Sequence, residues 1–190
     1  MFKNLLLATV LLSSVSVFAK TEAVAVDPAA SKIVFLGKKV TGEHTGEVKI
    51  QEGTLSFDGK AFKEANVVVD MTTISNNDLT DKEYNKKFID HMNSADFFDT
   101  AANKTATLKT TKVTKVKGDT YKVTGDLTIK GKTNPVTFNA DVTRAGATAV
   151  IKVDRTKYDI KYGSGKFFQG LGDKMINDEF QLTVTLVTKK

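Results

Sequence analysis

The stretches YKVTGDLTI (residues 121–129) and VTFNADV (residues 136–142) decide the fold of this chain. Apolar side chains occupy every second position of both, except at Gly125, where the backbone of another strand is expected to approach closely. Alternation with period two is typical of strands that have one buried and one wet face. Residues 131–135 form the expected connection, and Pro135, as the first residue of the second strand, costs no hydrogen bond. The two stretches therefore predict neighbouring antiparallel strands.

The same alternation extends outward from this pair in both directions. It covers residues 33–57, 67–71, 106–116, 149–153, 158–162 and 180–186. A change of parity near Thr110 or Thr111 predicts a β-bulge. About eight strands result, several of them nearly ten residues long, and the economical arrangement is one closed antiparallel barrel that can enclose a small ligand. The all-β alternative is a sandwich of two sheets.

One segment, residues 74–98, interrupts the strand pattern. Tyr84, Phe88 and Met92 fall on one face of a helix, which we expect over about residues 81–93. Thr80 and Glu83 have the spacing of a capping box. A single amphipathic helix in an all-strand chain is expected to cover an open end of the barrel.

The amino-acid composition excludes several kinds of functional site and partner. The 190 residues contain no Cys and no Trp, which excludes disulfides, thiolate nucleophiles, Cys-ligated zinc and iron–sulfur clusters. No Pro-, Gly- or Ser-rich linker divides residues 20–190, which are read as one domain. The net charge of +6 comes mostly from Lys residues spaced among Thr on exposed strand faces. That distribution argues against nucleic acid as a partner.

The first residues predict export. Lys3 precedes an apolar run at residues 5–12, and Val17-Phe18-Ala19 supplies a cleavage site before Lys20. The run falls short of the ~20 residues that a spanning helix needs and is followed by serines, so stable membrane insertion is not expected. We therefore expect residues 1–19 to be a secretory signal peptide.

Motifs for enzymatic chemistry are scarce. The sequence contains no G-x-S-x-G elbow, no dinucleotide-binding G-x-G-x-x-G after a strand, no H-E-x-x-H and no phosphate-binding loop. The two histidines, His44 and His91, could form a metal site only with a carboxylate such as Asp90, and hydrogen-bonded roles are more common for such residues. We expect no catalytic residue, no metal and no cofactor apart from a bound lipid.

Four blocks of the sequence together resemble the YceI-like family. They are KKVTGEHTG (residues 38–46), SADFFD (94–99), GDLTIKGKTNPVTF (125–138) and VDRTKYDI (153–160), and they occur in the order of the family. The resemblance implies a lipocalin-like barrel in the periplasm that holds a long apolar molecule such as a polyisoprenoid. A homodimer is left open.

Candidate ligand contacts follow from the apolar residues that strand alternation does not require. Burial of a lipid tail contributes about 25 cal/mol per Å² of apolar area, so a dry tunnel can bind it without a catalytic group. Arg155 could grip a polar head group, or it could form a structural ion pair with Asp154, Asp159 or Asp173. The full set of candidate contacts is Phe35, His44, Phe88, Met92, Phe97, Phe98, Arg155, Tyr158, Phe167, Phe168, Leu171 and Met175.

The expected function is therefore a periplasmic, non-enzymatic binding protein or carrier for a polyisoprenoid, an isoprenoid quinone or a similar amphiphile. One alternative is a barrel enzyme that acts on such a lipid, with His44 or a carboxylate as the base. Another is a stress-response protein whose interior is packed with side chains.

Overall fold

The computed structural model describes residues 21–190, so the expected signal peptide lies outside the described residues. It contains nine strands and one α-helix, α1 (Lys82–Asn93), with two short 3-10 helices, η1 (Arg155–Tyr158) and η2 (Gly172–Lys174). The strands are β1 (Glu22–Ala25), β2 (Lys32–Lys39), β3 (Gly42–Asp58), β4 (Ala61–Asn76), β5 (Thr105–Lys117), β6 (Thr120–Ile129), β7 (Lys132–Thr143), β8 (Gly146–Asp154) and β9 (Glu179–Val187).

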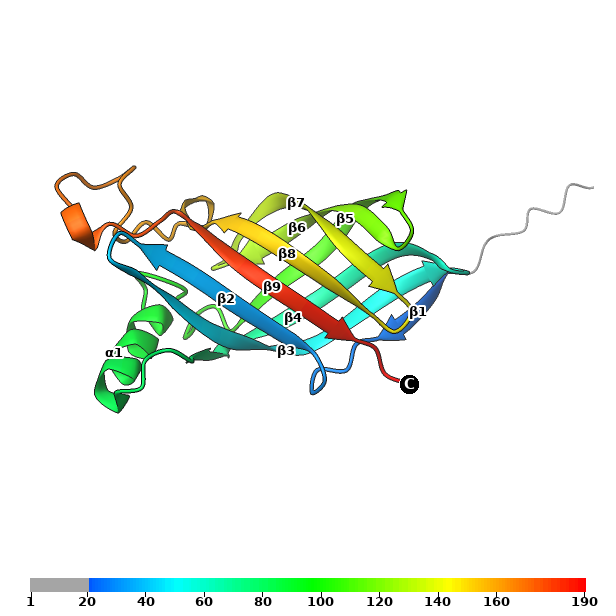
Figure 1. Ribbon diagram of the computed structural model, residues 1–190, viewed down its shortest axis with the longest axis horizontal. Helices are drawn as coiled ribbons and strands as arrows, with labels where there is room; N and C mark the ends of the chain where they lie inside the picture. The colour runs from blue at the N-terminus through cyan, green and yellow to red at the C-terminus, as the bar shows by residue number, and fades with distance from the viewer. Residues whose placement is uncertain (1–20) are drawn as a thin grey trace, which may run out of the picture.

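Eight of the strands form a closed antiparallel ring (Figure 1). The order around the ring is β3, β2, β9, β8, β7, β6, β5, β4, and pairing of β3 with β4 closes it. β1 lies outside this ring and pairs with the second half of β3. The predicted eight-stranded barrel is confirmed, and the sandwich is excluded.

The hairpin of β6 and β7 is tighter than the sequence predicted. Only Lys130 and Gly131 connect the strands, and both have positive φ, 50° and 68°. Pro135 lies inside β7 opposite Asp126. Its missing N–H costs nothing there, because β8 pairs with β7 only from Ala140 onward and leaves that side of Pro135 unpaired.

Two local irregularities of the sheet agree with the sequence. The register between β5 and β6 shifts between Thr110 and Lys112, which is the predicted bulge. A Cβ added at Gly125 would lie 2.9 Å from the carbonyl oxygen of Lys109, so the expected close approach of another strand is present. A larger residue would push these two strands apart.

The helix begins one residue later than predicted and is capped differently. Asp81 is the N-cap, and its side chain accepts hydrogen bonds from the backbone N–H groups of Glu83 and Tyr84. The capping box that the sequence suggested at Thr80 is therefore wrong, because the carboxylate of Asp81 takes that role. Tyr84 is 66% exposed, so the helix turns Phe88, Ile89 and Met92 toward the barrel instead.

The two ends of the barrel differ. At the end near β1, Phe62 stacks against Phe57 and Tyr121 with ring centroids 5.9 and 5.5 Å away, and the three buried rings fill the interior. The Arg144 guanidinium lies over the outer face of Phe57. At the opposite end lie α1, the β2–β3 hairpin and the long loop before β9 (Figure 1).

The segment after β8 does not form the strand that was expected at residues 158–162. Residues 158–162 keep the parity of a strand, but the structure forms η1 and then an irregular turn there. Asp159, with φ of 61°, ends η1 in the left-handed conformation. The apolar side chains at 158 and 160 are buried by this turn, not by a strand pairing. Within residues 21–190, no helix is long and apolar enough to cross a membrane.

Candidate functional site

A cavity opens at the α1 end of the barrel. This near chamber contains about 920 Å³ of empty space, including the part that is open to solvent. Phe88 and Met92 of α1 and Phe35 of β2 contribute apolar walls, and the exposed Lys38 and Lys39 of β2 lie at its opening. The chamber therefore has a mostly apolar interior, with Lys38 and Lys39 at its opening and the buried Arg155 in its wall.

A second, deep chamber occupies the middle of the barrel and contains about 1020 Å³ of empty space by the same measure. Apart from three Thr residues, its lining is apolar, and inward-facing residues of the ring strands supply it. Val48, Phe180 and Leu182 line both chambers, so the two spaces meet at these side chains. The two apolar chambers are therefore adjacent inside the barrel, and Phe62 is among the residues that line the deep one.

The structure divides the candidate contacts into two groups. The near chamber is lined by Phe35, His44, Phe88, Met92, Phe97, Phe98 and Arg155. Neither chamber is lined by Tyr158, Phe167, Phe168, Leu171 or Met175. Phe167 and Phe168 are each 49% exposed on the loop before η2. Contact of this second group with a lipid stays a prediction.

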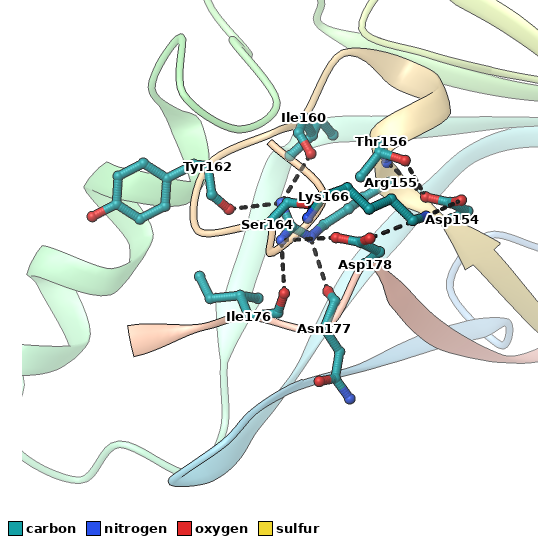
Figure 2. A network of polar contacts seen from close by, with 10 residues as sticks. All are labelled: Asp154, Arg155, Thr156, Ile160, Tyr162, Ser164, Lys166, Ile176, Asn177 and Asp178. Carbon is teal, nitrogen blue, oxygen red and sulfur yellow. Dashed lines mark hydrogen bonds and ion pairs between the residues drawn. The ribbon is translucent and has the colours of Figure 1, made fainter. Parts of the chain in front are cut away.

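Arg155 is buried, and its guanidinium donates hydrogen bonds to backbone carbonyl oxygens (Figure 2). Nε donates to Asn177 at 2.9 Å and Nη2 to Ile176 at 3.0 Å. Nη1 donates to Ile160 at 2.9 Å and to Tyr162 at 2.8 Å. Four of its N–H groups therefore tie together the two sides of the loop between η1 and β9.

The ion-pair partner of Arg155 is Asp178, whose Oδ1 lies 3.7 Å from Nη2. The sequence hypothesis named three other aspartates, and among them Asp154 instead contacts Lys166 at 3.3 Å. Lys166 also bridges to Asp178 Oδ2 at 3.0 Å (Figure 2). Burial raises the pKa of Asp178, but the hydrogen bond from Ser164 and the contacts with Lys166 and Arg155 outweigh it and lower the pKa below its ordinary value. The carboxylate is thus held ionised under the loop.

Tyr158 lies beneath the same loop and is 1% exposed. Its hydroxyl has no hydrogen-bond partner among the described residues. Burial, together with the charge of Asp154, raises the pKa of this phenol to about 12. The ring acts as packing, and the hydroxyl remains protonated.

His44 forms the most polar point of the chamber wall. It takes the inward-facing parity of β3, and its ring packs against Phe88 with centroids 4.8 Å apart. Nδ1 lies 2.7 Å from Oδ2 of Asp78. The other oxygen of Asp78 accepts from Thr45 N at 2.8 Å and from Asn76 Nδ2 at 2.7 Å.

These hydrogen bonds fix the charge of Asp78. Burial raises the pKa of the carboxyl, but the hydrogen bonds from His44, Thr45 and Asn76 outweigh it, and the pKa lies below its ordinary value. An ionised carboxylate can only accept hydrogen bonds. His44 Nδ1 is therefore the donor of the pair.

A metal site of the two histidines finds no support in the geometry. His44 is paired with Asp78, whereas His91 packs against Phe97 and Tyr162 at 4.8 and 4.6 Å. Between residues 21 and 190, no group of three or more acidic or imidazole side chains could hold a metal ion.

Several lining residues were missed by the sequence. Val48, Phe180 and Leu182 carried the signal of inward parity, but parity does not separate a cavity wall from a packed core. Ile176 carried no signal. It reaches the chamber because its backbone bridges to Lys39 across the mouth.

Comparison with known proteins agrees with this architecture. The YceI-like domain matches residues 25–188. Protein YceI of Escherichia coli is 36% identical over 132 residues, which cover 63% of this chain and 65% of that protein. A UPF0312 protein of Vibrio parahaemolyticus is 39% identical over 103 residues, covering 53% of this chain and 51% of that protein. The matches thus span about half to two thirds of these relatives.

Solved structures extend the likeness to almost the whole barrel. BcnA of Burkholderia cenocepacia is 29% identical with a TM-score of 0.68, covering 86% of this chain and 99% of that chain. A polyisoprenoid-binding domain from Saccharophagus degradans has the same fold at 14% identity, with a TM-score of 0.59 and coverage of 90% and 99%. Because the domain match runs from residue 25 to residue 188, the chain belongs to the YceI-like family.

Proposed function

We propose that this protein is a periplasmic, non-enzymatic carrier that holds a long apolar lipid inside its barrel. The ligand class is a polyisoprenoid, an isoprenoid quinone or a similar amphiphile. The observation that carries the proposal is the presence of two adjacent apolar chambers in the barrel, which share Val48, Phe180 and Leu182 as lining residues. A compact ligand would fill one chamber, whereas a long chain can occupy both.

The physical driving force is burial of the tail. Each Å² of apolar surface removed from water contributes about 25 cal/mol, and the deep chamber offers a lining that is apolar apart from three Thr. A packed interior, the alternative for a stress-response protein, would leave no such spaces. The Saccharophagus degradans domain of the same fold is described as polyisoprenoid-binding, which is the ligand class that this lining suits.

The compartment rests on the sequence. Residues 1–19 carry the features of a signal peptide, and a carrier outside the cytoplasm would need one. N-terminal sequencing of the exported protein should begin near Lys20. A mature protein that begins at Met1 would contradict export by cleavage.

Native mass spectrometry with organic extraction tests the carrier directly. Protein purified from the periplasm should carry a lipid that leaves on extraction, and a lipid added to the empty protein should be recovered chemically unchanged. Conversion of the added lipid would favour the barrel enzyme. Complete absence of lipid, with no uptake by the extracted protein, would refute the proposal.

A matched pair of variants on β8 locates the lipid. Ala149 lines the deep chamber, and the neighbouring Val150 points outward and is 54% exposed. Ala149→Phe should shorten the longest chain that the barrel retains, because the new ring occupies the space for the tail. Val150→Phe should leave the retained chain lengths unchanged. Equal behaviour of the two variants would argue against a lipid in the deep chamber.

A further inference from the structure

A lipid held in this cavity needs a partner for its polar end. Arg155 is poorly suited to that task, because four of its N–H groups already donate to carbonyls. Lys38 is paired with Glu43 at 3.1 Å on the outside of the hairpin. Of the other polar side chains that line the near chamber, Lys39, His44 and Asn177, His44 is the one held by a side-chain hydrogen bond among the described residues.

The pairing with Asp78 decides what the His44 ring offers to the chamber. Nδ1 donates its hydrogen to the carboxylate, so in the neutral ring Nε2 has a lone pair and no hydrogen. Nε2 makes no hydrogen bond with any residue in the part of the chain that the structure describes. The exposed edge of the ring is therefore an acceptor.

The wall beside His44 leaves room for a ligand atom. His44 pairs across the sheet with Gly37, so the two residues face the same side. A Cβ added at Gly37 would meet nothing within 4 Å, although Gly37 lines the chamber. Phe88 bounds the ring on the helix side. An open space thus adjoins the His44 ring at the mouth, where the polar end of a buried lipid would lie.

We propose that His44 Nε2 binds the head group of the lipid and selects lipids that end in a hydroxyl donor over those that end in an ether or a carbonyl. This selection rests on the proposed carrier function and names its substrate class. A hydroxyl donates its hydrogen to Nε2, whereas an ether or carbonyl oxygen placed there meets another lone pair. Burial of a lone pair without a donor costs free energy that a hydroxyl-ended lipid does not lose.

Asp78→Asn provides a test in which affinity should increase. The oxygen at position 78 that faces Thr45 N–H and Asn76 Nδ2 must remain an oxygen, because both neighbours are donors. The new NH₂ group must therefore face His44 Nδ1. Nδ1 then becomes the acceptor, and the ring hydrogen moves to Nε2. The same histidine now presents a donor to the chamber.

Geranylgeraniol and its methyl ether are the probes, measured at pH 8.5 by displacement of an apolar dye from the lipid-free protein. The wild type should bind the alcohol about three- to tenfold more tightly than the ether, which is the range for one neutral hydrogen bond. In Asp78→Asn the ether should gain that factor, and the alcohol, which can also accept, should keep its affinity. The preference should fall to about one through a gain for the ether.

Two substitutions control for packing. His44→Phe keeps a ring against Phe88 but removes the acceptor, so it should lower the affinity for the alcohol about three- to tenfold without lowering the affinity for the ether. His91→Phe replaces the other histidine, which lines neither chamber, and should alter neither affinity.

The outcomes separate the subsite from the carrier. If both probes bind the wild type equally, or if Asp78→Asn weakens both, the lipid is carried without a head-group bond to His44 and this proposal is wrong. If neither probe displaces the dye and no other long-chain lipid does, the carrier function fails and the subsite fails with it.

Discussion

Replacement of Arg155 by Met separates a structural role from a ligand role. The change removes the four N–H groups that bind carbonyls and leaves the carboxylate of Asp178 without its buried partner. A single hydrogen bond from a charged group is worth about 1.5 to 3 kcal/mol, but carbonyls of a loop can regain water. Loss of one partner of a buried ion pair costs about 3 to 5 kcal/mol, and we expect a loss of stability in that range.

Thermal denaturation followed by circular dichroism measures the effect. For a protein of this size, each kcal/mol corresponds to about 2–4 °C, so Tm should fall by about 6–20 °C. Arg144→Met is the matched control, because Arg144 is 42% exposed and pairs with Glu22 on the surface. That variant should lose about 1 kcal/mol or less. Arg155→Lys should lose less stability than Arg155→Met, because its ammonium keeps a cation for Asp178 although it cannot bind all four carbonyls.

Lipid binding by Arg155→Met completes the test. Affinity for a phosphate-bearing lipid and for an uncharged lipid should fall equally, since both depend on the loop that Arg155 holds. An unchanged Tm combined with a selective tenfold loss of the phosphate-bearing lipid would refute this reasoning and place the guanidinium on the head group.

Three further predictions concern the loop and the mouth. Tyr158→Phe removes a buried hydroxyl without a partner among the described residues, so calorimetry should show stability that is equal or up to about 1 kcal/mol higher. Gly46→Ala places a Cβ against the backbone carbonyl oxygen of Ser75 on β4 and 2.6 Å from Cζ of Phe35, so β3 and β4 must separate, which should cost at least about 1–3 kcal/mol in urea denaturation. The folded state lowers the pKa of Asp178 below 3.8, so its stabilisation is complete above that pH and is lost as pH falls through the lowered value. Tm of the wild type should therefore fall more steeply below about pH 4 than Tm of Asp178→Asn.

The barrel could be predicted from the sequence because the alternation of apolar and polar residues along each strand indicates which of its faces is buried. The alternation in residues 121–129 is a local consequence of a sheet with one wet face, and the break at Thr110 is a local consequence of the bulge. The alternation failed at residues 158–162, where parity continues but no strand forms. There the buried guanidinium of Arg155 holds the chain in a turn through carbonyl groups, which have no side-chain signature.

The site could be predicted only in part, because local spacing does not show where a loop places its side chains. Phe88, Met92 and Phe97 reach the chamber because the helix and the turn after it cover the mouth, as their spacing indicated. Phe167 and Phe168 looked equivalent in sequence, but their loop carries them to the surface. The partner of Arg155 lies 23 positions further along the chain, beyond the reach of local spacing, and only the folded loop brings Asp178 to it.

In the proposed carrier, the three rings that pack together at the β1 end of the barrel would set the order of events in lipid exchange. A tube that is sealed at one end loads and unloads through the same opening, so a chain that slides in with its tail leading must come out with its polar end leading. Every additional isoprene unit has to pass Phe180 and Leu182 on the way out, and the residence time should therefore grow with chain length more than the loading rate falls. A membrane or protein that receives the cargo meets the water-soluble end first and must draw out the rest.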